Sequence, residues 1–204
     1  MNIVRNMIIS AVALALFAMA GTFFVSYTFD NTIDRINDNK RIALLKSIHV
    51  LISPESHDND IFTDIIHVSN KNLLGSKKPV NVYRARKDKN PIAVIINSIA
   101  PDGYNGNIEL LVAIQYDGTL AGVRVTHHKE TPGLGDAIEE SRSNWIKTFA
   151  QKSLANTETK DWAVKRDGGE FDQFTGATIT PRAIVKAVYN TLRYYKEHRD
   201  TLYE

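Results

Sequence analysis

Cysteine is absent from this chain of 204 residues. Its absence excludes disulfides, thiolate chemistry and cysteine-ligated iron–sulfur clusters, and a zinc site would have to use histidine and carboxylate ligands alone. The absence fits either side of a membrane, because an exported chain need not carry disulfides. If the protein carries electrons, the simplest carrier is therefore an organic cofactor.

An excess of charge of one sign is also lacking. The chain has 25 basic and 23 acidic residues, a formal net charge of +2 and a pI near 8.7. Basic residues are interspersed with acidic ones and form no stripe, so a nucleic-acid partner is not expected. The sequence also has no internal repeat and no Gly-x-Gly-x-x-Gly fingerprint after a strand, which argues against a free-standing dehydrogenase.

A metal site is not expected from the histidines. His127 and His128 are adjacent, and neighbouring residues on a strand point to opposite faces. No carboxylate cluster with metal-ligand spacing accompanies them. We therefore interpret both as residues of the surface or of a hairpin end.

Charged residues are missing altogether from Asn6 to Phe29. The nearly apolar stretch 7–27 is long enough to cross a membrane, because about 20 residues rising 1.5 Å each span a hydrocarbon core of about 30 Å. The alternative is a signal peptide cleaved after residues 18–20 (AMA). The apolar run continues past that point, however, so a retained anchor is favoured.

The chain length suits one anchor and one domain of ordinary size. We expect residues 1–30 to form the transmembrane anchor, 31–75 a connecting helix and linker, and 76–204 the main domain. Basic residues flank the anchor on both sides, so the positive-inside rule does not settle its orientation.

Beyond the anchor, helical and strand patterns alternate and predict an α+β domain with a mixed or antiparallel sheet. Asp117-Gly118 between two apolar runs indicates a hairpin. Asp136 and Glu139 have the spacing of a capping box at the start of a helix over 137–150. Further helices are expected at 41–51 and 181–198, and strands at 61–68, 80–85, 92–96, 108–114, 122–126 and 162–165.

Small residues and three threonines stand directly before the last expected helix. Thr180 is a good N-cap, and Pro181 falls at the first helical position, where its missing N–H costs nothing. Gly176 and Ala177 leave a side-chain-poor entry, and the positive end of the helix dipole favours a phosphate there. From these residues alone, an ordinary capped helix after a glycine turn remains the alternative.

The segment DQFTGAT at 172–178 closely resembles the flavinylation motif of the RnfG/RsxG family, the G subunits of Rnf/Rsx ion-translocating electron-transport complexes. It also resembles the motif of the related C subunits of the sodium-pumping NADH:quinone oxidoreductase. In that family, FMN is joined through its phosphate to the last threonine of a Ser/Thr-Gly-Ala-Thr tetrad. The tetrad is TGAT at 175–178 here, so the matching residue is Thr178. The family-like segments ETPGLGD at 130–136 and APDGYNG at 100–106 appear in the expected order, and the resemblance covers nearly the whole chain.

The resemblance implies an FMN-binding domain with flanking helices, in which Thr178 is a modified residue and not a catalyst. Asp172 matches the first position of the motif that a dedicated flavin transferase recognises, although a plain turn aspartate is an equal alternative. The turn around Pro132 suits a backbone that comes close to a flat ring, and Tyr104 could supply an aromatic wall. The expected cofactor-binding residues are Gly103, Tyr104, Glu130, Thr131, Pro132, Gly133, Leu134, Gly135, Thr175, Gly176 and Ala177. Arg182 and Lys186 could offset the phosphate charge, or could simply be solvated.

The resemblance also implies the setting of the protein. It predicts a single-pass protein of the bacterial inner membrane, with a cytoplasmic N-terminus and a periplasmic domain in contact with lipid. Other membrane and peripheral subunits of an Rnf/Rsx-type complex and the flavin transferase would be its partners. In this interpretation, covalent FMN relays electrons in a complex that couples ferredoxin or NADH chemistry to ion movement. The alternatives are a module that binds FMN reversibly as a sensor or store, and a flavin-free assembly subunit.

Overall fold

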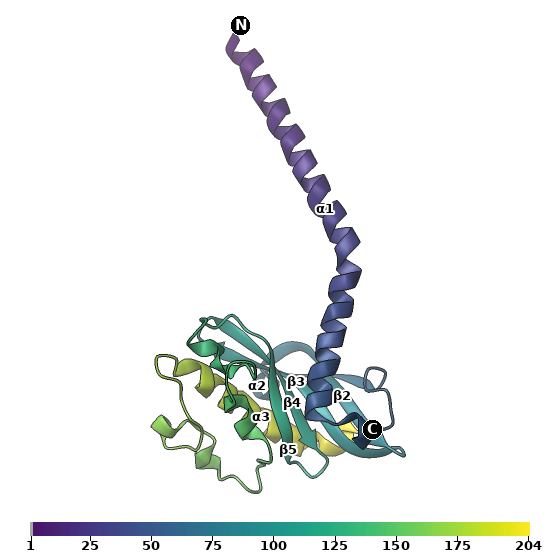
Figure 1. Cartoon of the computed structure of the whole chain (residues 1–204), viewed down its shortest axis with the longest axis vertical. Coiled ribbons are helices and arrows are strands. Elements are labelled where there is room, and N and C mark those ends of the chain that lie inside the picture. The colour runs from purple at the N-terminus through teal and green to yellow at the C-terminus, as the bar shows by residue number, and fades with distance from the viewer. Residues whose placement is uncertain (1) are drawn as a thin grey trace. The chain divides into compact units, whose positions relative to one another are not determined.

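The computed structural model describes residues 2–204, which fall into two compact units, Met1–Lys46 and Ser47–Glu204. The first unit belongs to a single helix, and the second contains one sheet and the remaining helices (Figure 1). The predicted α+β class, with an antiparallel sheet and flanking helices, is confirmed. The expected limits at residues 30 and 75 stay a prediction, although the sheet also includes residues 65–70.

Helix α1 runs from Asn2 to Leu51, and the helix expected over 41–51 is its last part. Nothing interrupts it, because the first proline of the chain is Pro54. Its apolar part has a mean hydropathy of 2.4 over the window that is long enough to cross a membrane, and none of this window is buried within the protein. The hydroxyl of Thr22 donates to the carbonyl of Ala18 at 2.8 Å, so it needs no water in a lipid environment.

The second unit is built on five antiparallel strands that pair in chain order. The turn between the fourth and fifth strands contains Asp117, which accepts the N–H of Thr119 at 2.8 Å, and Gly118 at φ +91°. The hairpin predicted at this point is therefore confirmed. The strands are β1 (Ile65–Asn70), β2 (Ser76–Lys87), β3 (Asn90–Gly103), β4 (Gly106–Gln115) and β5 (Leu120–His127).

The predicted strands at 80–85, 92–96, 108–114 and 122–126 lie inside β2 to β5. Two other expectations were less accurate. The strand expected over 61–68 begins only at Ile65, because residues 61–63 form a turn in which Asp60 accepts backbone N–H groups. The strand expected over 162–165 is reduced to a bridge between Val164 and Phe171. The connection between β1 and β2 contains the short helix α2 (Lys71–Leu74).

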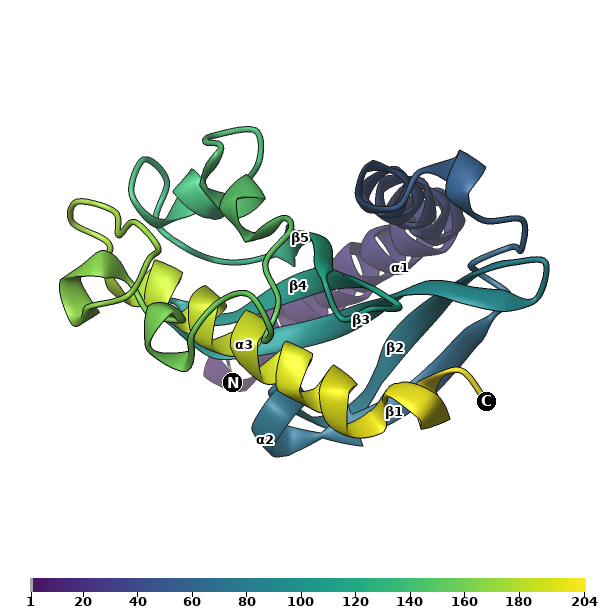
Figure 2. The ribbon, with the colours of Figure 1, turned by 90° about the horizontal axis from the view of Figure 1, so that it is seen from below.

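Helix α3 (Ile179–Leu202) packs across one face of the sheet (Figure 2). Alternate residues of β3, such as Val94 and Ile96, face it and are fully buried. Between the apolar layers, the hydroxyl of Thr191 on the helix donates to Ser98 on β3 at 2.7 Å. This contact gives the buried Ser98 hydroxyl a partner, while the Thr191 hydroxyl also lies 2.8 Å from the carbonyl of Ala187 within the helix.

The opposite face of the sheet is covered by the segment that begins at Ser47. Ile48, Leu51 and Ile52 are buried, and a Cβ on Gly122 would lie 2.8 Å from Leu51 Cδ2. Ile95 on β3 points to this side and is fully buried. Because both faces are covered, the central strands are nearly continuous apolar runs.

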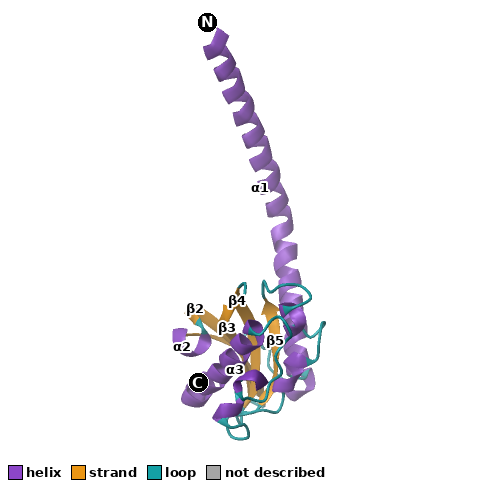
Figure 3. Ribbon diagram, turned by 90° about the vertical axis from the view of Figure 1, so that its left-hand side faces the viewer, coloured by secondary structure: helices purple, strands orange, loops and turns teal. Residues whose placement is uncertain are grey.

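Residues 128–178 form a long connection of loops and short 3₁₀ helices (Figure 3). The helix predicted over 137–150 is wrong, since only η2 (Gly135–Ile138) and η3 (Trp145–Phe149) occur there. Ser143 donates to the carbonyl of Ala137 at 2.6 Å and accepts the N–H of Trp145 at 3.1 Å. Such local side-chain bonds compete with a continuous helix. The rest of the connection includes η4 (Thr159–Asp161) and η5 (Lys165–Asp167).

Candidate functional site

Three loops that are distant in sequence meet where α3 begins. They are the β3–β4 turn at 104–105, the turn 131–134, and the turn 174–177 that leads into the helix. Between them lies a cavity of about 540 Å³. Its lining consists of Tyr104, Glu130, Thr131, Leu134, Gly135, Gly176, Ala177, Thr178, Ile179, Thr180 and Arg182.

The turn 131–134 has the backbone that its sequence favours. Proline stands second and Gly133 third, with φ +78°, a conformation that glycine adopts without strain. The N–H groups of Leu134 and Gly135 both donate to the carbonyl of Thr131, at 3.1 and 3.0 Å. The turn therefore places the Leu134 side chain, 43% exposed, at the rim of the cavity.

The turn 174–177 faces it. Ala177 donates to the carbonyl of Phe174 at 3.2 Å, and Gly176 has φ +81°. A Cβ at Gly176 would lie 3.4 Å from Leu134 Cδ2, so the two turns are in contact across the cavity. Glycine at 176 thus serves both the conformation of the turn and the close approach of the neighbouring loop.

Helix α3 starts one residue after Thr178, which occupies the N-cap position. The expectation that Thr180 caps the helix and that Pro181 is its first residue was wrong. Thr180 is the second helical residue and Pro181 the third, where a missing N–H still costs nothing. The Thr178 side chain makes no capping bond, and among residues 2–204 its hydroxyl has no hydrogen-bond partner.

Glu130 connects the β3–β4 turn to the first turn of α3. It is only 4% exposed, and its carboxylate accepts the hydroxyl of Thr180 in a very short hydrogen bond. The other carboxylate oxygen accepts the N–H of Asn105 at 3.0 Å. Glycines allow this packing, because a Cβ at Gly103 or Gly135 would lie 3.1 or 3.0 Å from a carboxylate oxygen of Glu130.

Behind Glu130, its own backbone is held by His128. The N–H of Glu130 donates to His128 Nδ1 at 3.0 Å, so Nδ1 is an acceptor and the ring proton lies on Nε2. Nε2 contacts Glu139 Oε1 at 2.7 Å. This hydrogen bond from His128 holds the pKa of the Glu139 carboxyl below its ordinary value, with a further contribution from the hydroxyl of Ser141.

Ion pairs surround the start of α3. Arg182, at the rim of the cavity, donates two hydrogen bonds to Asp167, at 2.5 and 2.6 Å. This pair raises the pKa of Arg182 and lowers that of Asp167, because each charge stabilises the other. Lys186, also suggested as a phosphate contact, lies 2.6 Å from Asp102 and does not border the cavity.

The predicted site residues thus divide into two sets. Seven of them border the cavity: Tyr104, Glu130, Thr131, Leu134, Gly135, Gly176 and Ala177, together with the expected attachment residue Thr178. Gly103, Pro132, Gly133 and Thr175 shape the surrounding turns and do not border it. Asp172 also lies outside, in an ion pair of 2.6 Å with Lys165.

Two lining residues were missed. Ile179 is 46% exposed and was not among the predicted site residues. Thr180 was taken for a cap, and nothing in its local sequence reveals that Glu130, fifty positions earlier, is its partner. Within residues 2–204, no group of three or more histidine or carboxylate side chains could hold a metal ion.

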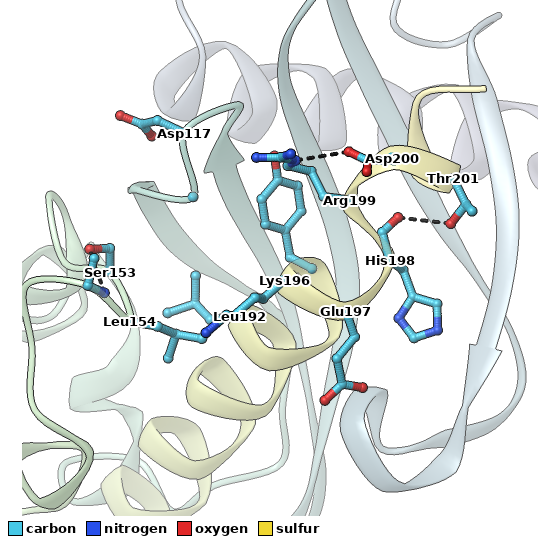
Figure 4. Close-up of a pocket in the computed structure, with 13 residues that line it drawn as sticks. Asp117, Ser153, Leu154, Leu192, Lys196, Glu197, His198, Arg199, Asp200 and Thr201 are labelled. Carbon is cyan, nitrogen blue, oxygen red and sulfur yellow. Dashed lines mark hydrogen bonds and ion pairs between the residues drawn. The ribbon is translucent and has the colours of Figure 1, made fainter.

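A second cavity, of about 440 Å³, lies against the C-terminal half of α3 (Figure 4). Leu192, Leu154 and Tyr195 contribute to its wall, and the pair Arg199–Asp200 is 3.1 Å apart. The hydroxyl of Tyr195 already donates its proton to the carbonyl of Tyr116, at 3.0 Å. None of the predicted site residues borders this second cavity. The cavity beside the start of α3 is therefore the candidate functional site.

Comparison with known proteins adds two family matches. Residues 103–193 match the FMN-binding domain, and residues 1–51 match the RnfG N-terminal region. The FMN-binding match includes all three loops of the cavity, and the other match includes α1.

Curated relatives match over almost the whole chain. The G subunit of the ion-translocating oxidoreductase complex of Aliivibrio fischeri is 45% identical over 193 residues, which are 95% of this chain and 92% of that protein. The proteins of the same name from Shewanella baltica and Vibrio cholerae are 44% and 43% identical, over 97% and 93% of this chain and 93% and 90% of their own lengths. Among solved structures, NqrC of Shewanella oneidensis has 23% identity and a TM-score of 0.47, over 71% of this chain and 74% of that one.

Proposed function

Because this chain belongs to the family of G subunits of ion-translocating oxidoreductase complexes, we propose that it is a membrane-anchored electron carrier with one FMN esterified to Thr178. The observation that supports the attachment point most directly is the Thr178 hydroxyl. It stands at the N-cap of α3, borders the cavity and is engaged by no other group among the described residues.

The residues around the cavity fit a flavin nucleotide. Its volume is in the range of small-molecule sites, roughly 300–1,000 Å³. Tyr104, Leu134 and Ile179 are 65%, 43% and 46% exposed at its rim, where a bound ring system would shield them from water. FMN supplies a ring that can take up one or two electrons, and the protein tunes it by packing and hydrogen bonding.

The start of α3 suits the phosphate. The N–H groups of Ile179 and Thr180 have no acceptor within the helix, and they lie at the positive end of its dipole. Arg182 adds positive charge at the rim but is already paired with Asp167, so we expect it to contribute less than an unpaired arginine. The backbone, rather than a cationic side chain, would then hold the phosphodiester.

Among the described residues that line the cavity, none is hydrogen-bonded to the Thr178 hydroxyl as an activating base. A threonine hydroxyl is a weak nucleophile unless a base accepts its proton. Glu130, the carboxylate among the described residues that line the cavity, is hydrogen-bonded to Thr180 and not to Thr178. We therefore propose that a separate flavin transferase transfers the FMN part of FAD to the Thr178 hydroxyl, with AMP as the leaving group and the hydroxyl proton passing to a base of the transferase. Asp172, which is exposed just before the turn, would be part of the segment that the transferase recognises.

The central test is the mass of the full-length protein expressed together with a flavin transferase. We expect a gain of one FMN less one water in the wild type, and no gain in Thr178→Ala. Thr159→Ala is the matched control, because this threonine is also exposed but lies outside the segment 172–178, and its replacement should leave the modification intact. Modification that persists in Thr178→Ala would refute the assignment of the attachment residue.

Two other functions can be separated by the same preparation. A reversible FMN-binding module would lose its fluorescence on a denaturing gel, whereas an esterified flavin would stay on the band. A flavin-free assembly subunit would show no flavin absorbance even when the transferase is present.

The proposed location is the inner membrane, with the second unit on the periplasmic side and other subunits of an Rnf-type complex as partners. The cysteine-free chain makes the orientation testable. Glu158→Cys places one thiol at a position whose side chain is 72% exposed, and Ile3→Cys places one before the apolar run. A membrane-impermeant thiol reagent added to intact spheroplasts should label only the former, and labelling of only the latter would reverse the orientation.

A further inference from the structure

The connection between β5 and α3 contains two buried tryptophans with different surroundings. Trp145 and Trp162 are each 7% exposed and both belong to the same aromatic cluster. We propose that Trp145 is a positioning residue, which holds the attachment segment (residues 172–178) beside the cavity. That this segment carries the flavin rests on the function proposed above, whereas the contacts of Trp145 are observed in the structure.

Trp145 contacts the attachment segment at two residues. Its indole Nε1–H donates to the carbonyl of Asp172 at 2.8 Å. Its ring also meets Phe174 edge to face, with centroids 5.2 Å apart and an interplanar angle of 69°, a favoured geometry for aromatic pairs. Fixing positions 172 and 174 removes most of the freedom of the chain between them.

The contact between Trp145 and Phe174 also restrains the backbone next to Thr178. Phe174 and Ala177 form a bridge, with the N–H of Ala177 donating to the carbonyl of Phe174 at 3.2 Å. Thr178 is the next residue, and α3 begins directly after it. The attachment residue is therefore held between a turn anchored by Trp145 and a helix anchored in the core.

Trp145 is itself tied to the opposite loop of the cavity. Its backbone N–H donates to Ser143 Oγ at 3.1 Å, and Ser143 donates to the carbonyl of Ala137 at 2.6 Å. Ala137 lies in η2, the short helix that begins with the cavity residue Gly135. Beneath the indole, fully buried Phe149 packs edge to face at 5.3 Å. Trp145 thus connects the two loops that face each other across the cavity.

Trp162 provides a matched control. It packs on Phe171 and Tyr189, with centroids 5.6 and 5.8 Å away. Its buried Nε1 has no hydrogen-bond partner in the described part of the chain. Replacing either tryptophan with phenylalanine removes the same volume from the aromatic cluster, but only at position 145 does it remove a hydrogen bond to the attachment segment.

The test is amide hydrogen exchange of the full-length, unmodified protein in detergent. For Trp145→Phe we expect exchange in residues 173–178 to rise, by about fivefold at Ala177, whose N–H donates to the carbonyl of Phe174. This factor corresponds to about 1 kcal/mol for the lost hydrogen bond. Trp162→Phe should leave exchange of this segment within about twofold of the wild type. Phe174→Leu, which removes only the ring contact, should accelerate the same amides and provides a second route if Trp145→Phe folds poorly.

A second measurement uses protein modified with FMN. Trp145→Phe should lower the fluorescence anisotropy of the attached flavin, while Trp162→Phe should not change it. Equal exchange in the two tryptophan variants, or faster exchange spread evenly over the domain, would overturn the positioning role. If no variant and no wild-type sample carries flavin, the proposed function fails, but the exchange experiment on unmodified protein still decides the role of Trp145.

Discussion

The hydrogen bond between Thr180 and Glu130 should be one of the strongest single contributions to the stability of the second unit. The prediction concerns Thr180→Val, which keeps the shape of the side chain and removes its donor. Glu130 would remain 4% exposed, with one carboxylate oxygen deprived of its partner and little access to water. Its other oxygen would keep the N–H of Asn105.

The expected loss follows from the type of bond. Hydrogen bonds to charged groups contribute about 1.5–3 kcal/mol, so Thr180→Val should lower the free energy of unfolding by about 2 kcal/mol. For a domain of roughly 150–250 residues, 1 kcal/mol corresponds to about 2–4 °C in Tm, so the transition should fall by about 4–8 °C. Thr180→Ser keeps the hydroxyl and removes one methyl group, which should cost about 0.8 kcal/mol.

Urea unfolding of the detergent-solubilised full-length protein measures this difference. Tryptophan emission is a suitable signal, because Trp145 and Trp162 both lie in the second unit. Thr175→Val is the control, since Thr175 is exposed and its replacement should stay within about 0.5 kcal/mol of the wild type. If Thr180→Val is as stable as this control, the short contact contributes nothing and the role of Glu130 as a link between the loops is wrong.

Three further predictions concern other parts of the chain. Gly135→Ala would place a methyl group 2.9 Å from Glu130 Cβ, and we expect this overpacking to cost about 1–3 kcal/mol in the same urea assay. Because the pKa of Glu139 is lowered by His128, its stabilising effect is present above the ordinary carboxyl pKa of about 4.3 and is lost as the pH falls. Glu139→Gln should therefore be less stable than the wild type at pH 7 by under about 1 kcal/mol, and the gap should close as the pH falls through the lowered pKa of the folded state; a gap that widens in acid would contradict this sign. In the membrane, Leu14→Lys puts a charge in the apolar window at a cost of about 2.5–3.5 kcal/mol, and carbonate extraction should release more of this variant than of the wild type.

The sequence predicted the sheet well where both local pattern and burial agree. The central strands at 92–96 and 108–114 are long apolar runs, and the Asp117-Gly118 turn between β4 and β5 has the residues that its conformation requires. The same holds for the cavity loops, because Gly133 and Gly176 mark turns with positive φ directly in the sequence.

The failures come from competing hydrogen-bond partners, some distant along the chain and some local. The capping-box spacing at Asp136 suggested a helix, but Glu139 is bonded to His128 instead of the backbone that a cap would serve. Thr180 looked like an N-cap because local rules cannot reveal that its hydroxyl would be bonded to Glu130. The apolar stretch that starts at Ile61 forms a turn first, since Asp60 captures the N–H groups that a strand would have paired.

The order of the strands has a consequence for when the cavity can exist. Each strand of the second unit pairs with the one before it, so the sheet can assemble step by step as the chain leaves the ribosome or translocon. The turn 174–177 and the first residues of α3, by contrast, follow all five strands. On the function proposed above, a modifying enzyme would meet Thr178 only after all five strands have been synthesised, and flavin loading would be a late step of biogenesis.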